Sequence, residues 1–485
     1  MTISGSLSNA LSGLTAAARA AEVASSNVAN ALTDGYGRRE VSLSARSLAG
    51  TGSGVRVDGV TRVVDQHIIT DRQLADAQYE QTQARLEFLT SLEASIGLPE
   101  EPNSLNARIA ALDGRLVEAA SRPDSEPRLQ GVLQATQDLA SHINNVSGDI
   151  QNLRLAADRN IAKDVNALND TLTRIADLNY EVRAQRSAGR DASSLMDQRQ
   201  QLVDQISAII PMRTVPRGGE QIALISSGGA ILIDGKPAEI GFTPVGTIVP
   251  EMTLASGALS GLTINGVPVS TKAETGPIAG GRLAGNFEVR DVLAVDGQER
   301  IDAVARDLIE RFQDPAVDPT LGIGDAGIFT DNGSAFAAVN EIGIAARLTI
   351  NAQIDPDNGG AVWRLRDGIG APSQGEIGDA SGLENLIAAL SDKRSPASGG
   401  FMGAARSFSG LGSDVLSLVG IERQNTEADK SYTLSKRDTL KELELQTGVD
   451  TDQELQQLLM IENAYAANAR VIQTVDDMIK TLLGL

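Results

Sequence analysis

The sequence predicts an elongated, mainly α-helical protein with a β-rich insert, an α+β fold. Two observations indicate the helices: both ends of the chain carry apolar residues at helical spacing, and a heptad pattern runs through residues 129–182. A third indicates the insert, because residues 212–284 are rich in Gly, Pro, Val, Ile and Thr and contain alternating runs. Helices precede and follow this insert, so the chain runs out and returns.

The first predicted helix spans residues 1–32. Steps of four and three from Ile3 give an unbroken apolar seam of the coiled-coil kind. Its large side chains are Ile3, Leu7, Leu14 and Val28. The opposite face carries only Arg19 and Glu22 as charges, although a helix on the surface of a soluble monomer normally sets a charged face against water. We therefore expect other helices to cover this one.

The last predicted helix, residues 452–485, carries a matching seam with one polar member. The seam consists of Leu458, Ile461, Tyr465, Asn468, Ile472, Val475, Ile479 and Leu482. Such a pair buries too little apolar surface to offset an ordering cost of about 1–2 kcal/mol per residue. Both helices are thus expected to be unsettled in a monomer and ordered where further copies cover them. Periodicity alone equally allows an ordinary helix pair that caps one globular domain.

Strand and helix patterns follow the first helix. Gly35 and Gly37 can end that helix because glycine readily takes positive φ. The patterns predict strands near 41–43 and 55–57, a flexible turn at 48–54, and helices at 61–96 and 104–121.

The longest helical signal starts at Leu129. Its heptad seam runs to Ile175 with one stutter, which is expected to unwind a supercoil locally. Up to Val182 the segment would be roughly 80 Å long, which predicts a rod. Another helix follows, and its charged residues Asp197 and Arg199 are interpreted as a solvated face.

Turn signals mark hairpins within the insert. They are Gly228-Gly229, Asp234-Gly235 and Asn265-Gly266. Further predicted elements are helices at 283–312, 381–390 and 412–448 and a strand at 348–354. This nested order places both termini at one end of the molecule and the insert at the other. The predicted domains are a terminal coiled-coil (inner tube) domain of 1–35 and 450–485, a helical rod of 36–211, 285–315 and 405–449, and a β-rich outer domain of 212–284 and 316–404.

Composition limits the functional classes. A net charge of -21 argues against a nucleic-acid partner, because phosphate binding needs clustered Lys and Arg. The chain has no cysteine and two histidines, which leaves few ligands for a transition metal. There is no secretory signal and no stretch of about 18 apolar residues that could span a membrane. By these rules alone the protein is expected in the cytoplasm.

Motifs for catalysis fail in context. GIGDAG at 322–327 matches a dinucleotide-binding pattern, but neither a strand nor a helix flanks it as that site requires. DPDNGG at 355–360 resembles the start of a calcium loop whose twelfth position is Arg366 instead of Glu. Tyr36 and Trp363 are interpreted as packing residues. We therefore expect no catalytic residues, no metal site and no cofactor, and hence no enzyme.

Two end segments resemble the terminal signatures of bacterial flagellar axial proteins. SSNVANALTDGY at 25–36 matches the amino-terminal signature, and residues 455–485 resemble the carboxy-terminal helix. The middle segment RIADLNYEVRAQRSAGRDASSLMDQRQQLVDQIS, residues 174–207, is similar to the helical region of the hook-associated junction proteins. Residues 125–144 and 318–330 also fit, whereas the resemblance weakens between about 237 and 280.

The resemblance implies a structural subunit that self-assembles between hook and filament. Implied partners are the hook protein, a second junction protein on the filament side and an export chaperone at the carboxy-terminal helix, with no nucleic acid and no membrane insertion. The resemblance also implies export through the flagellar type III apparatus without a cleaved signal. The protein is then expected outside the cell and not in the cytoplasm. The alternatives are another axial subunit, such as the second junction protein, or an adhesin or enzyme that uses the β insert.

The terminal helices and the signature give the predicted assembly interface. It comprises Ile3, Leu7, Leu14, Asn27, Val28, Asn30, Gly35, Tyr36, Leu458, Ile461, Tyr465, Ile472, Val475, Ile479 and Leu482.

Overall fold

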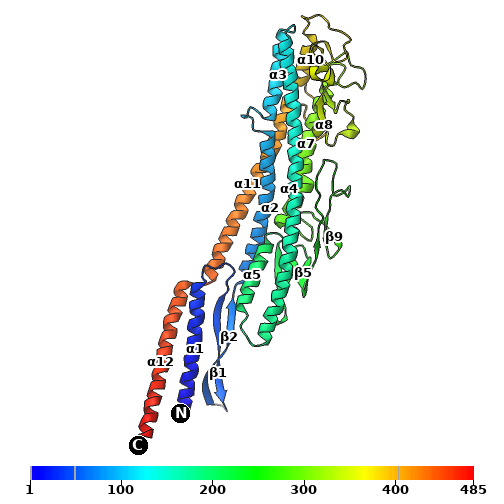
Figure 1. Ribbon diagram of the computed structural model, residues 1–485. Helices are drawn as coiled ribbons and strands as arrows, with labels where there is room; N and C mark the ends of the chain where they lie inside the picture. The colour runs from blue at the N-terminus through cyan, green and yellow to red at the C-terminus, as the bar shows by residue number, and fades with distance from the viewer. Residues whose placement is uncertain (1–2, 49–50, 402, 485) are drawn as a thin grey trace.

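The structure is a computed structural model that describes residues 3–48, 51–401 and 403–484 (Figure 1). The molecule is elongated, and both termini lie at one end, as predicted. Parts of the predictions for residues 1–2, for the turn at 48–54 and for residue 485 lie outside the described residues.

The end with the termini consists of two helices, a hairpin and the loop 30–37 that joins the first helix to the hairpin. We call this end the terminal module. Its elements are α1 (Ile3–Ala29), β1 (Arg38–Leu48), β2 (Thr51–Val63) and α12 (Thr451–Leu483). β1 and β2 pair antiparallel over 11 and 13 residues, so the strands are longer than predicted. The predicted helix start at residue 61 was wrong: β2 continues to Val63, and the Asp65 side chain accepts the first free N–H groups of the next helix.

Long helices form the rod. They are α2 (Gln66–Ile96), α3 (Leu105–Ser121), α4 (Glu126–Ser187), α5 (Ser193–Ser207) and α11 (Phe408–Thr447). With 62 residues α4 is about 93 Å long and carries the predicted apolar seam on its buried face. Near the stutter the buried residues include Arg154 and Asp158, and Arg290 forms an ion pair with Asp158 at 2.7 Å.

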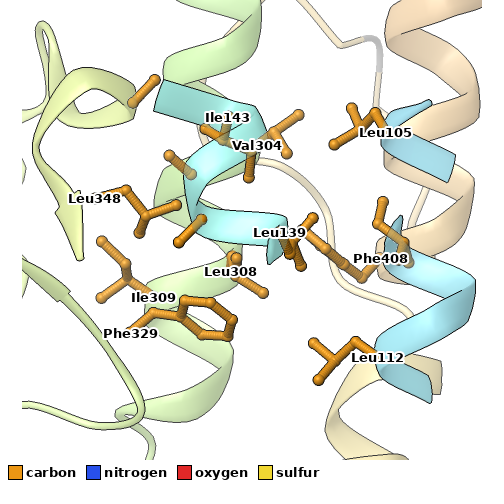
Figure 2. Packing of buried hydrophobic residues seen from close by; sticks show 14 of the residues in the cluster. Leu105, Leu112, Leu139, Ile143, Val304, Leu308, Ile309, Phe329, Leu348 and Phe408 are labelled. Carbon is orange, nitrogen blue, oxygen red and sulfur yellow. The ribbon is translucent and has the colours of Figure 1, made fainter. Parts of the chain in front are cut away.

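A hydrophobic core surrounds the first half of α4. Figure 2 shows Leu139 of α4 between Leu308 of α7 (Ala294–Phe312) and Phe408 of α11, and Ile143 of α4 beside Val304 of α7. α6 (Gly281–Glu288) precedes α7, and a π-helical segment, Val289–Leu293, joins them. The predicted helix over 283–312 is therefore continuous, but its turns widen at the π-helical segment. Arg290 is buried in that segment.

Residues 212–269 form two small antiparallel sheets. The first contains β3 (Met212–Pro216), β4 (Ile222–Ser226), β5 (Ile231–Asp234) and β6 (Lys236–Pro237), and the second β7 (Ile240–Gly241), β8 (Leu262–Ile264) and β9 (Val267–Val269). All three predicted hairpin turns are confirmed. In the turn between β8 and β9, Asn265 and Gly266 both have positive φ, 52° and 78°, as a type I′ turn requires.

The insert does not lie at the far end, which corrects that prediction. It packs beside the second half of α4, because Leu224, Leu232 and Leu262 share a hydrophobic cluster with Leu168 and Leu172. The far end instead holds the segment from 316 to 401 (Figure 1). Its larger buried apolar side chains, such as Leu348, Leu365 and Leu386, pack in the same hydrophobic core as the first half of α4.

Residues 316–404 are mostly irregular with short helices. Their elements are β10 (Phe329–Asp331), β11 (Leu348–Ile350), α8 (Ile344–Arg347), α9 (Arg364–Asp367) and α10 (Ser381–Ser391), with short 3₁₀ turns between them. Of the segment 348–354 that was predicted as a strand, only the first three residues, Leu348–Ile350, form one.

A buried carboxylate ties this segment to the rod. Asp302 on α7 accepts hydrogen bonds from the backbone N–H groups of Gly343 and Ala345, at 2.8 and 2.9 Å, and from the side chain of Gln298. Burial nevertheless raises the pKa of Asp302 to about 6, because it disfavours the charged form more than these bonds favour it.

We expect this group to make stability depend on pH. Its folded pKa of about 6 exceeds the unfolded value of 3.8, so the folded state binds more protons in that interval. The stabilisation is fully present below about pH 4 and is lost as the pH rises through 6, by on the order of 3 kcal/mol. Urea unfolding of the wild type and Asp302→Asn between pH 4 and 7 measures it. Equal pH slopes in the two proteins would contradict the assignment.

Candidate functional site: terminal helices and elbow

Helices α1 and α12 lie side by side and run antiparallel, with α1 between α12 and the hairpin (Figure 1). The predicted seam of α1 faces these neighbours: Ala10, Ala17 and Ala24 are buried. Its larger members Leu7, Leu14 and Val28 are half-buried, and Ile3 is exposed. Small residues thus mark the closest approach, while the large side chains are only partly covered in one chain.

α12 is even less covered. Among its described residues only Glu454 and Val475 are buried. The half-buried members of the predicted seam are Leu458, Ile461, Asn468, Ile472 and Ile479. Tyr465 and Leu482 are exposed, so the seam that α1 covers does not include every predicted member.

α12 carries further apolar side chains that the sequence prediction did not single out. They are exposed in the single chain: Leu455, Leu459, Met460, Val471, Met478 and Leu483. Three of them belong to a second seam, since steps of four and three lead through Met460, Ala464, Ala467, Val471, Thr474 and Met478. α12 therefore has one apolar face on α1 and another towards solvent.

The polar member of the seam, Asn468, has a specific counterpart. A Cβ atom at Gly13 of α1 would lie 2.8 Å from the side-chain amide of Asn468. The two helices therefore approach closely at this point, and the missing side chain of Gly13 makes room for the amide.

The flagellar signature builds the elbow, which we define as residues 30–39, 62–65 and 448–450, where the terminal module meets the rod. Asn27 is buried, and its side chain accepts from the Arg39 N–H at 3.0 Å and donates to the Arg39 carbonyl at 2.9 Å. It also accepts from the Tyr36 hydroxyl at 2.9 Å. Asn27 therefore holds β1 against α1 within the chain.

The remaining signature residues have local roles in the same turn. Asn30 donates to the Ser26 carbonyl at 2.9 Å. Gly35 has φ of 75°, which favours glycine, and the Arg39 guanidinium lies over the Tyr36 ring at 4.8 Å. Tyr36 is half-buried, so it packs as predicted and also donates a hydrogen bond.

Asp197 anchors the elbow to the rod. Its carboxylate accepts from the Gly37 N–H at 3.0 Å and forms ion pairs with Arg39 at 2.8 Å and Arg62 at 2.7 Å. Our interpretation of Asp197 and Arg199 as a solvated face was wrong, since both are buried. Arg199 donates to Asn179 and to the Glu220 carbonyl, each at 2.8 Å.

The periodicity of α5 contained a signal for this role. Arg199 falls in phase with Val203 and Ile206, both of which are also buried, along one face of the helix. A buried charge needs a partner: Asn179 and the Glu220 carbonyl supply it for Arg199, and the arginines of the hairpin supply it for Asp197.

A second set of charges lies on the α11 side of the elbow. Glu454 in the first turn of α12 pairs with Arg38 at 2.9 Å. Arg72 on α2 contacts Asp76, Asp204 and Glu444, the last in α11. Burial raises the pKa of Asp76 and of Glu444, although Arg72 opposes it. A cavity of about 440 Å³ separates the terminal module from the rod beside these groups.

Within residues 3–48, 51–401 and 403–484 no group of three or more His, Cys, Asp or Glu residues could hold a metal ion. In the same ranges, none of the helices combines the length and the hydropathy of a membrane span. Gly322–Gly327 forms a turn that the Asp325 carboxylate closes on the Gly322 N–H.

Comparisons with known proteins agree with this architecture. Three family models match in chain order: the flagella basal body rod protein over residues 7–36, the helical domain of flagellar hook-associated protein FlgK over 90–315, and the carboxy-terminal part of the basal body rod FlgEFG proteins over 446–485. Flagellar hook-associated protein 1 of Bacillus subtilis is 22% identical, covering 99% of this chain and 97% of its own length. The chain is thus similar to the hook-associated protein 1 family over nearly its whole length.

Two further proteins named flagellar hook-associated protein 1 and one solved structure are similar to this chain. The Escherichia coli protein is 23% identical, covering 99% of this chain and 99% of its own length. The Salmonella typhimurium protein is 25% identical, covering 53% of this chain and 50% of its own length. A solved structure of the flagellar hook junction protein FlgK from Burkholderia pseudomallei has 18% identity and a TM-score of 0.45, covering 54% of this chain and 47% of its own. The rod and hook-associated models match, respectively, the segments that form α1 and most of the rod. The chain is therefore a structural component of the flagellum that assembles with other axial components.

We expect Asp197→Asn to loosen the elbow. The substitution removes the negative charge opposite two largely buried guanidinium groups and destabilises the elbow by on the order of 3 kcal/mol. Hydrogen exchange of the amides at 37–41 and 60–63 measures the loss. Asp177→Asn, at an exposed aspartate on α4, is the matched control. Unchanged protection of these amides in Asp197→Asn would refute the anchor.

Proposed function

We propose that this chain is a structural subunit of the hook–filament junction and that it assembles with copies of itself through α1 and α12. One observation carries the proposal: α12 buries a single apolar side chain, Val475, while it exposes a second apolar seam. An isolated helix of such length is marginal in water, so neighbouring copies are the natural cover for that seam.

The predicted interface fits this role in two parts. Leu7, Leu14, Leu458 and Ile472 are half-buried and belong to the pair within one chain, whereas Tyr465 and Leu482 are available to other copies. The signature residues Asn30, Gly35 and Tyr36 contribute by setting the elbow that presents the helices. We propose residues 1–35 and 450–485 as the inner-tube domain, to which the hairpin attaches.

The partners and the location follow from the family role. We propose that copies contact the hook protein on one side and a second junction protein on the filament side. The protein is proposed to leave the cell through the flagellar type III apparatus without a cleaved signal, and to function outside the cell. Before export a chaperone would cover the apolar faces of α12. The role we propose is structural and not catalytic.

We expect Val471→Asp to abolish junction assembly while the chain still folds. Val471 is 43% exposed in the single chain, so the new charge is tolerated there, but burying it between copies costs on the order of 3 kcal/mol per contact. Electron microscopy of flagella and sedimentation of the purified chain give the readout. Circular dichroism checks the fold.

Val117→Asp is the matched control because Val117 is 50% exposed on α3, away from the terminal module. It should leave assembly intact. Normal junctions built from Val471→Asp chains would disprove the role of the second seam. Antibody labelling of hook–basal bodies that lack filaments separately tests the location, since a subunit of another axial segment would label elsewhere.

A further inference from the structure

The elbow is packed on one side and open on the other. Its cavity of about 440 Å³ lies between residues 31–36 of the terminal module and side chains of α2, α5 and α11. Protein interiors are normally close-packed, so the terminal module and α11 are not in full contact there. The opposite side is held by the buried Asp197 and its partners Gly37, Arg39 and Arg62.

The chain connections allow movement about that anchor. α11 ends at Thr447, and Gly448 has φ of −80° and ψ of −128°, outside the helical range. α12 starts anew at Thr451 with Asp450 as its cap, so the two helices do not form one stiff element. Arg38 pairs with Glu454 and thereby joins the base of the hairpin to the first turn of α12. The terminal module can thus move as one body.

Two unpaired charges of opposite sign line the cavity. Asp34 belongs to the terminal module and Lys441 to α11, and both line the cavity wall. In the described part of the chain neither takes part in an ion pair within 4.0 Å. The other charged groups of the wall have partners: Arg72 contacts three carboxylates, and Arg437 pairs with Asp438.

We propose that the elbow is a two-state joint: the terminal module pivots about Asp197, and closure of the cavity pairs Asp34 with Lys441. A solvated ion pair gains little free energy, and a polar cavity holds water at little cost, so neither state dominates. The same chain therefore presents its terminal helices at two angles to the rod. This inference does not depend on which axial segment the chain builds.

Disulfide trapping in assembled full-length chains, in which neighbouring copies cover α12, tests the joint because the chain has no cysteine of its own. Ala31→Cys and Leu445→Cys face the cavity from its two sides. We expect them to cross-link under mild oxidation as the joint closes. Asp34→Lys sets like charges opposite each other and should slow cross-linking about five- to tenfold. Adding Lys441→Asp should restore the rate.

Two controls accompany the test. Gly13→Cys with Asn468→Cys, at positions in contact, reports that α1 and α12 are paired in the same preparation. Asp429→Lys, at an exposed aspartate of α11 outside the cavity wall, should not change the rate. The same cross-linking rate with and without Asp34→Lys, or no cross-link between residues 31 and 445 while the 13–468 pair forms, would overturn the proposal. Failure of Val471→Asp to block assembly would leave this result untouched.

Discussion

The molecule is organised around α12, a helix that its own chain covers on one face only. α12 has 33 residues and packs mainly on α1, with Val475 as its one buried apolar side chain. A helix with one apolar face on a neighbour and another in water is stable only weakly alone, because most helical stability in proteins comes from packing. The rod has no such need, since α4 buries residues along its full length. The chain therefore combines a self-sufficient rod with an end that requires neighbours.

The elbow connects these two parts and explains what the terminal signature does. The Asn27 side chain forms hydrogen bonds with both the N–H and the carbonyl of Arg39. It also accepts a hydrogen bond from the Tyr36 hydroxyl. Asp197, 160 residues from Gly37 in sequence, then fixes this turn to α5. The signature residues thus encode the direction in which α1 leaves the rod. In the assembly proposed above, contacts between copies depend on that direction even where these residues do not touch a neighbour.

Helix periodicity predicted the architecture well because it records which face is buried. The seams of α1, α4 and α12 and the turn at Asn265-Gly266 followed from local patterns. The burial of Asp197 and Arg199 was missed because their partners lie far away in sequence, although the spacing of Arg199 with the apolar residues of α5 indicated a buried face. The position of the insert was missed for a similar reason: only the packing of Leu224 against the second half of α4 decides it. The end of β2 was misplaced because its last residues also fit a helix.

Hydrogen exchange of the amides of α12, in dilute monomer and in assembled junctions, tests the central claim most directly. The account predicts rapid exchange along residues 455–483 in the monomer, strong protection of the same amides after assembly, and protection of α4 in both states. Equal, strong protection of α12 in the dilute monomer would show that the terminal helices are complete without neighbours and would contradict the account.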